Sequence, residues 1–175
     1  MKQICLILLI VLGYLSFLPR GVAAEHATPY EVVKKVEAAV LLLEQTKCAD
    51  LNKFDQPTSL WVWKDTYLFI IDCSRMTVAA HPVSPELIGK NQSQLCDVNG
   101  KPFFSQFCQV GEEGEWIDYF WPRPGSEKAS RKISYIKRVP GTDFAVGGGL
   151  YEELLEVEEL VEFTREMFRS GQLFH

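Results

Sequence analysis

Residues 28–43 carry a helical pattern of apolar residues. Thr28 can cap a helix, Pro29 suits its first turn, and Glu31 completes a capping box with Thr28. Apolar residues then recur at intervals of three and four, which places them on one helix face: Val33, Val36, Val40 and Leu43. We therefore predict a helix over residues 29–47 that lies across another layer of the protein.

The middle of the chain carries short runs of aromatic and β-branched residues, which are typical of strands. Lys64–Asp65 forms a turn between two of these runs. Pro82 and Pro85 end a third, because proline donates no hydrogen bond to a strand ladder. The predicted strands cover residues 60–64, 66–72 and 77–80. We expect a loop over 52–59, a loop or short helix over 87–95, and a helix from Lys101–Pro102 to about residue 110.

Residues 114–151 contain two further apolar runs on either side of the loop 122–129. The second run ends at Pro140–Gly141, and a third ends in three glycines, 147–149. This pattern predicts a three-stranded antiparallel meander, in which the glycines allow close approach of the backbone or a bulge. Its strands bring basic and aromatic side chains close together: Trp116, Tyr119, Trp121, Lys132 and Tyr135. A cation among such rings suits a small carboxylate, because the cation pairs with the charge and the rings cover the apolar part.

Residues 152–170 repeat the helical pattern at the end of the chain. Glutamates lie near its start and Arg165 and Arg169 near its end, as the helix dipole favours, and Gly171 is a suitable stop. We predict an amphipathic helix here. Helix, short strands, a helical insertion and a meander together indicate an α+β fold with an antiparallel sheet.

The N-terminus has the properties of a secretory signal peptide, residues 1–24. Lys2 precedes an apolar run from Ile4 to Leu18, and Val22-Ala23-Ala24 gives a small-residue cleavage site. The apolar run is short for a membrane span, so an uncleaved membrane anchor is the less favoured alternative. With no second run of spanning length, we expect an exported, stand-alone protein, periplasmic or secreted.

Charge and length narrow the function further. The 175 residues fit one domain. Without residues 1–24, 16 Lys and Arg stand against 23 Asp and Glu, a net charge of −7. This disfavours nucleic acid and anionic membranes as partners, and it means that an anion needs a local cationic pocket.

Four cysteines follow the predicted cleavage site: Cys48, Cys73, Cys96 and Cys108. An even number in an exported protein suggests two disulfides, for which three pairings exist. The sequence leaves the pairing open, and also one bridge or none, because buried free cysteine is common. A metal site is disfavoured, since the chain has no C-x-x-C and no histidine at ligand spacing from a cysteine.

Several motifs in order resemble the single Cache domains of bacterial chemoreceptors and histidine kinases. They are Ala80-His81-Pro82, Leu87-Ile88-Gly89-Lys90-Asn91, Asp97-Val98-Asn99-Gly100-Lys101, G-x-W-x-x-Y-x-W-P from Gly114, R-K-I-S-Y-I-K-R-V-P-G-T from Arg131 and V-G-G-G-L-Y from Val146. The resemblance implies a PAS-like Cache domain over residues 28–151. In such a fold a long N-terminal helix packs on a five- to six-stranded antiparallel sheet, and the ligand lies on the other face. Residues 152–175 then form a C-terminal amphipathic helix and tail.

Lys132 is the leading candidate for contact with a ligand carboxylate, and in the family the basic residue before I-S-Y is a plausible contact. Arg131 is the runner-up, since alternation along a strand sends only one of the two to a given face. Tyr119 and Trp121 share one strand face and Trp116 lies on the other, with the register that selects the pocket face left open. The further candidates are Tyr135, His81 and Tyr67. Each of these rings has an alternative as an ordinary core or turn residue.

Other chemistry is poorly supported. Asp97 to Lys101 resembles the opening of a calcium loop, but Lys101 and Pro102 occupy positions that need an oxygen ligand and glycine, so we interpret it as a turn. The chain has no G-x-S-x-G, H-E-x-x-H or C-x-x-C-H motif. We therefore expect neither an enzyme nor a cofactor.

These sequence features are consistent with two functions. The first is a sensor of a short-chain carboxylate, for which the resemblance implies acetate, propionate, lactate or pyruvate. It would signal through a separate membrane receptor or kinase, with a dimer through the C-terminal helix as a further option. The second is an exported interaction or scaffold module without a small ligand. A buried Lys132 that faces a closed pocket favours the first, and a filled interior with Lys132 in solvent favours the second.

Overall fold

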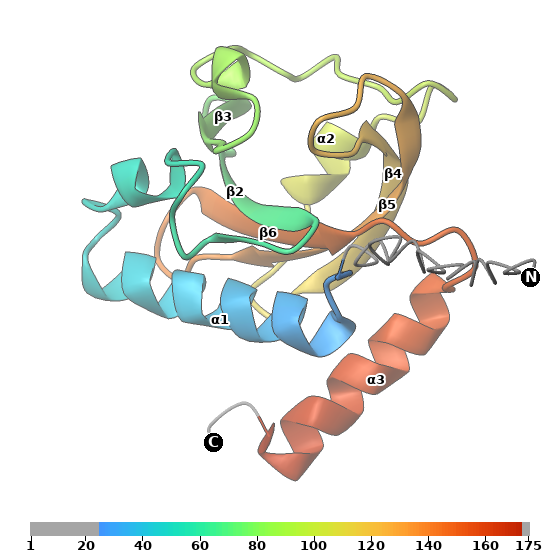
Figure 1. The fold of residues 1–175 in the computed structure, drawn as a ribbon. Helices are drawn as coiled ribbons and strands as arrows, with labels where there is room; N and C mark the ends of the chain where they lie inside the picture. Colours follow the sequence, from blue (N-terminus) through green and yellow to red (C-terminus); the bar gives the residue numbers. More distant parts are fainter. Residues whose placement is uncertain (1–24, 173–175) are drawn as a thin grey trace, which may run out of the picture.

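One antiparallel sheet of six strands forms the middle layer of residues 25–172, the part of the chain that the computed structural model describes (Figure 1). The strand order is β1-β2-β6-β5-β4, and β3 also pairs with β2. The strands are β1 (Val62–Trp63), β2 (Thr66–Asp72), β3 (Thr77–Ala80), β4 (Glu115–Pro122), β5 (Ala129–Arg138) and β6 (Phe144–Leu150). The α+β prediction is therefore confirmed. The predicted signal peptide lies outside the described residues.

The predicted meander is confirmed as β4, β5 and β6, which pair in sequence order. Tyr119 of β4 lies opposite Lys132 of β5, and Ser134 of β5 lies opposite Gly149 of β6. A pairing between segments distant in sequence completes the sheet, because β2 lies beside β6. This register determines which side chains of β2, β4 and β5 share a face.

Helix α1 (Pro29–Gln45) covers one face of the sheet, as predicted (Figure 1). The Thr28 side chain accepts a hydrogen bond from the Glu31 amide, and Glu31 binds back to the Thr28 amide, so the capping box is present. All four residues of the predicted apolar stripe are buried. They pack with residues of the sheet that include Leu68, Ile133 and Val146.

The opposite face is covered by α2 (Phe103–Phe107) and by the segment between β3 and α2, which includes the short 3-10 helix η2 (Pro85–Leu87). The three phenylalanines of α2 are buried against β2 and β4. The Asp97–Lys101 motif is a turn, in which Asp97 accepts hydrogen bonds from the amides of Asn99, Lys101 and Phe120. This face holds a cavity, which is described below.

Helix α3 (Val157–Ser170) ends at Gly171 as predicted, but it begins five residues later than the pattern suggested. The Arg131 guanidinium holds the preceding segment by donating to the carbonyl oxygens of Glu152, Glu153 and Leu155. Leu154, which belonged to the predicted apolar stripe, is therefore 91% exposed. Trp116 of β4 anchors α3 itself, because its Nε1 donates to the Thr164 Oγ1 at 2.8 Å.

Two other boundaries were too generous. The predicted strand 60–64 is reduced to the two residues of β1, because the chain turns at Ser59, whose carbonyl accepts from the Val62 amide. The predicted helix 101–110 is reduced to α2, which ends at Phe107 with Cys108 as its C-cap. Within residues 25–172, no helix is both long enough and apolar enough to cross a membrane.

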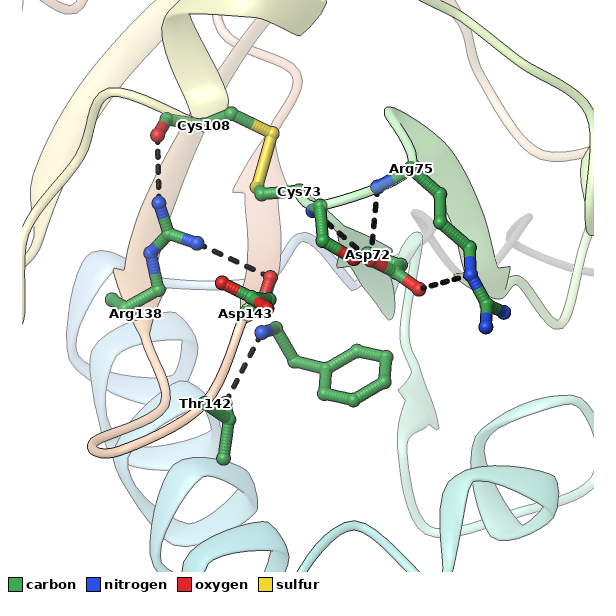
Figure 2. Close-up of a disulfide and its surroundings, with 9 residues drawn as sticks. Asp72, Cys73, Arg75, Cys108, Arg138, Thr142 and Asp143 are labelled. Carbon is green, nitrogen blue, oxygen red and sulfur yellow. Dashed lines mark hydrogen bonds and ion pairs between the residues drawn. A yellow bond between two sulfur atoms is a disulfide. The ribbon is translucent and has the colours of Figure 1, made fainter.

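A disulfide joins Cys73, after β2, to Cys108, at the end of α2 (Figure 2). The Arg138 guanidinium donates to the Cys108 carbonyl at 2.7 Å and to the Asp143 carbonyl at 3.2 Å. The Cys73 amide donates to that same Asp143 carbonyl at 2.9 Å. Covalent and hydrogen bonds together fix α2 to the ends of β2, β5 and β6.

The remaining two cysteines do not form the second disulfide that the even count suggested. Cys48 packs against the cluster on the α1 side of the sheet, whereas Cys96 is exposed in the segment that leads to α2. The two thiols therefore belong to opposite sides of the sheet.

The double substitution Cys73→Ser/Cys108→Ser should lower the free energy of unfolding by about 4 kcal/mol, the chain-entropy value for a loop of this length. The bridge closes a loop with a sequence separation of 35. Urea unfolding of both proteins measures the difference, with Cys96→Ser as the control. Equal stability of the double variant and the control would contradict a bridge between these residues.

Candidate functional site

Lys132 lies at the centre of the face opposite α1. Its side chain is fully buried, and its Nζ has no hydrogen-bond partner in the described structure. The amine lies over three aromatic rings, 4.1 Å from the centroid of Tyr67, 5.1 Å from Tyr151 and 5.3 Å from Phe69. Ring faces stabilise a cation but leave its hydrogens without acceptors. The amine is therefore able to donate to a ligand.

A cavity of about 30 Å³, measured as the space open to the centres of water molecules, adjoins this amine. One water needs about 10–15 Å³ of such space, so the cavity suits a molecule of only a few heavy atoms. Its walls are mostly aromatic and aliphatic side chains and come from β2, β3, β4, β5, α2 and the segment between β3 and α2. They are Tyr67, Phe69, Val78, His81, Leu87, Leu95, Phe103, Phe104, Phe107, Tyr119, Trp121 and Lys132.

His81 contributes the second polar group. Its Nδ1 accepts hydrogen bonds from the amides of Val83 at 3.3 Å and Ser84 at 2.9 Å, so Nε2 carries the hydrogen. Burial lowers the pKa of His81 to about 3, and the nearby Lys132 charge lowers it too. The imidazole is therefore neutral near pH 7, with Nε2–H as a donor.

Two tyrosines and a tryptophan complete the polar lining. The Tyr119 hydroxyl pairs with the Ser134 Oγ at 3.0 Å, and its ring stacks on Phe103 with centroids 4.4 Å apart. The Tyr67 hydroxyl interacts with the side chains of Tyr151 and Trp121, and burial raises its pKa to about 12. Burial raises the pKa of Tyr119 as well, so both hydroxyls are protonated at neutral pH.

The structure brings five of the seven predicted ligand residues together: Lys132, Tyr119, Trp121, His81 and Tyr67. The prediction that Trp116 and Tyr135 lie close to Lys132 is wrong. These two rings pack against each other on the α1 face, with centroids 5.3 Å apart. Side chains three residues apart on a strand point to opposite faces, which separates Trp116 from Tyr119 and Tyr135 from Lys132. The same alternation sends Arg131 away from the cavity.

Sequence reasoning missed several residues of the wall. Phe69 could have been found by alternation, because it is two residues from Tyr67. The same holds for Tyr151, whose ring lies beside the Lys132 amine and which follows Gly147 and Gly149 at intervals of two. Phe103 and Phe107 had no comparable signal. Their place depends on how α2 packs, which only the folded chain specifies.

The glycines of β6 make room for the cavity floor. A Cβ on Gly147 would clash with the Phe69 ring, and a Cβ on Gly149 would lie 2.7 Å from the Ile133 carbonyl oxygen and 3.0 Å from the Lys132 Cε. This confirms the predicted close approach. Glycine is required here so that Phe69 and Lys132 can lie flat over β6.

Burial lowers the pKa of Lys132 from its usual 10.5 to about 7, and the Asp65 carboxylate opposes this shift. Asp65 also accepts from the Ala27 amide and pairs with Arg123 at 3.7 Å. The desolvated ammonium is thus much less favourable than in water. An anion placed in the cavity would supply the missing partner.

Comparison with known proteins agrees with this architecture. The family model of Single Cache domain 2 matches residues 10–162. Methyl-accepting chemotaxis protein McpP of Pseudomonas putida is 26% identical over 105 residues, which are 59% of this chain and 18% of that protein. The chain thus spans less than a fifth of the length of that relative.

Solved structures share the fold. A periplasmic sensor domain of a chemotaxis protein superposes with a TM-score of 0.54 and 24% identity, over 71% of this chain and 90% of the other. A Cache chemosensory domain, solved to explain its carboxylic acid recognition, superposes with a TM-score of 0.56 and 20% identity, over 69% and 89%. At these identities the likeness concerns the fold.

The substitution Gly149→Ala should lower the free energy of unfolding by about 1–3 kcal/mol, because the added methyl overpacks the cavity floor. Gly111→Ala is the matched control, since nothing lies within 4 Å of a Cβ there. Urea unfolding measures both. A Gly149→Ala protein as stable as the control would contradict the close packing of β6 against Lys132.

The stability of the wild type relative to Lys132→Met should rise with pH between about 7 and 10.5. The folded-state pKa lies below the unfolded one, so the unfolded chain binds more protons in this window. The cost of burying the charged amine is therefore largest below pH 7, and it disappears above pH 10.5, where the amine is neutral in both states. The total change should be on the order of a few kcal/mol. Urea unfolding from about pH 6 to pH 10 measures it. Parallel pH curves for the two proteins would contradict a buried amine.

Proposed function

Because the chain belongs to the Single Cache domain 2 family, we propose that it is an extracytoplasmic sensor that binds a short-chain carboxylate beside Lys132. Cache domains of chemoreceptors are sensor modules that bind ligands, so we place the chain among signalling proteins and not among enzymes. The observation that supports a carboxylate ligand is the buried Lys132 amine, which adjoins a cavity and has no hydrogen-bond acceptor among residues 25–172.

Charge supports an anion. A second cation or a neutral donor would leave the ammonium unpaired, whereas a carboxylate would pair with it and accept further hydrogen bonds. His81 supplies one such donor through its Nε2–H group, and Tyr119, which also lines the cavity, supplies a hydroxyl. The chain carries a net charge of −5, so this local cation selects the anion against the overall field.

Size and polarity support a short chain. About 30 Å³ of space accommodates few atoms beyond a carboxylate. The rings of Phe69, Phe103 and Phe107 would surround the alkyl part and exclude water from it. Acetate, propionate, lactate and pyruvate meet these requirements. The related Cache chemosensory domain described above also recognises a carboxylic acid.

The scaffold alternative would require Lys132 in solvent above a filled interior. The residue is instead fully buried beside a cavity, which favours the sensor. We propose that residues 28–151 are the sensor unit and that residues 152–175 form a helix and tail. The likeness to chemotaxis sensor domains supports our proposal that the domain lies in the periplasm and passes its signal to a separate membrane receptor or kinase. A dimer through α3 belongs to the same proposal.

A calorimetric titration of residues 25–175 with acetate, propionate, lactate and pyruvate tests the function. We expect one of these acids to bind, and Lys132→Met to weaken its binding at least about 30-fold, because an ion pair buried from water is lost. At 100 times its dissociation constant the acid should also stabilise the wild type by about 2.7 kcal/mol.

Lys128→Met is the control, because Lys128 is exposed and lies in the loop before β5. It should bind the acid as the wild type does. Failure of the wild type to bind any of the acids, or equal binding by Lys132→Met, would refute the proposed carboxylate site.

A further inference from the structure

The cavity has a neighbour on its outer side. An open groove of about 350 Å³ lies between the segment that contains η2 and the loop that joins β4 to β5. Three side chains line both spaces: Tyr67, Leu87 and Trp121. These side chains therefore form the wall between the cavity and the groove.

The members of this wall differ in burial. Tyr67 is only 1% exposed and lies under the Lys132 amine. Leu87 and Trp121 are both half-buried and lie on opposite sides of the groove, at the end of η2 and in β4. The Trp121 indole packs edge-on against Phe103, with centroids 5.8 Å apart. Leu87 and Trp121 are therefore the outer part of the wall.

The position of the amine gives a bound acid a direction. Lys132 lines the cavity but not the groove, so the carboxylate would lie at the inner end. The alkyl part would then point toward the wall. Each added methylene would move the end of the chain closer to Trp121 and Leu87.

We propose that the groove is the entrance to the ligand cavity and that Trp121, with Leu87, sets the longest acid that the domain accepts. This inference rests on the proposed carboxylate function. Removal of the indole would join the cavity to the groove, so longer straight-chain acids could extend outward past Val83 and Pro122 while Lys132 still holds the carboxylate.

Calorimetric titration with unbranched monocarboxylates, from acetate to hexanoate, tests the proposal on the wild type, Trp121→Ala and Leu87→Ala. The wild type should lose affinity as the chain lengthens beyond the shortest acids. Trp121→Ala should instead gain about fourfold for each added methylene up to hexanoate, the value for burial of one methylene. Leu87→Ala should shift the profile in the same direction, which provides a second variant on the other side of the groove.

Trp63→Ala is the matched control, because Trp63 is also a half-buried strand tryptophan and it lines neither space. Its chain-length profile should equal that of the wild type. If the wild type binds acetate or propionate but Trp121→Ala and Leu87→Ala keep its profile, the filter is refuted and the carboxylate site stands. A shift of equal size in Trp63→Ala also refutes the filter. If the wild type binds no acid, the proposed function fails and the filter with it.

Discussion

The amine of Lys132 is removed from water without receiving a hydrogen-bond partner from the described part of the chain, and much of the surrounding structure follows from this. A charge in such a place is unfavourable unless something compensates it, and three ring faces do so only in part. The long side chain can lie over β6 because Gly149 has no Cβ, which would lie 3.0 Å from the Lys132 Cε. Helix α2 covers the cavity on the side away from the sheet and keeps water out, and the disulfide and Arg138 fix the end of this helix. The fold thus maintains an unfavourable group that the rings and the Asp65 carboxylate relieve only in part.

Much of this fold was predictable because its strongest signals are local. The capping box at Thr28 and Glu31 begins α1 where expected, and the meander follows from turns at positions that the sequence marks. The start of α3 was not predictable in this way. The backbone before it binds the guanidinium of Arg131, more than 20 residues away, and that contact overrides a continuous helical pattern.

The site was predictable to the extent that alternation along a strand is. Lys132, Tyr119 and Trp121 converge because β4 and β5 pair with Tyr119 opposite Lys132. Trp116 and Tyr135 are equally aromatic and equally near in sequence, yet parity sends them to the α1 face. The wall contributed by α2 depends on packing between distant segments, which composition and periodicity do not encode.

Lys132 and Arg131 are neighbours in β5, and they serve opposite sides of the sheet. One reaches the cavity, and the other holds the chain that enters α3. One planar peptide unit of fixed length joins their Cα atoms, so a shift of this part of β5 along the strand would carry both residues. Such a shift would therefore reach the cavity and the segment before α3 together. In mechanical terms, β5 connects the interior of the domain to the segment that leads into its last helix.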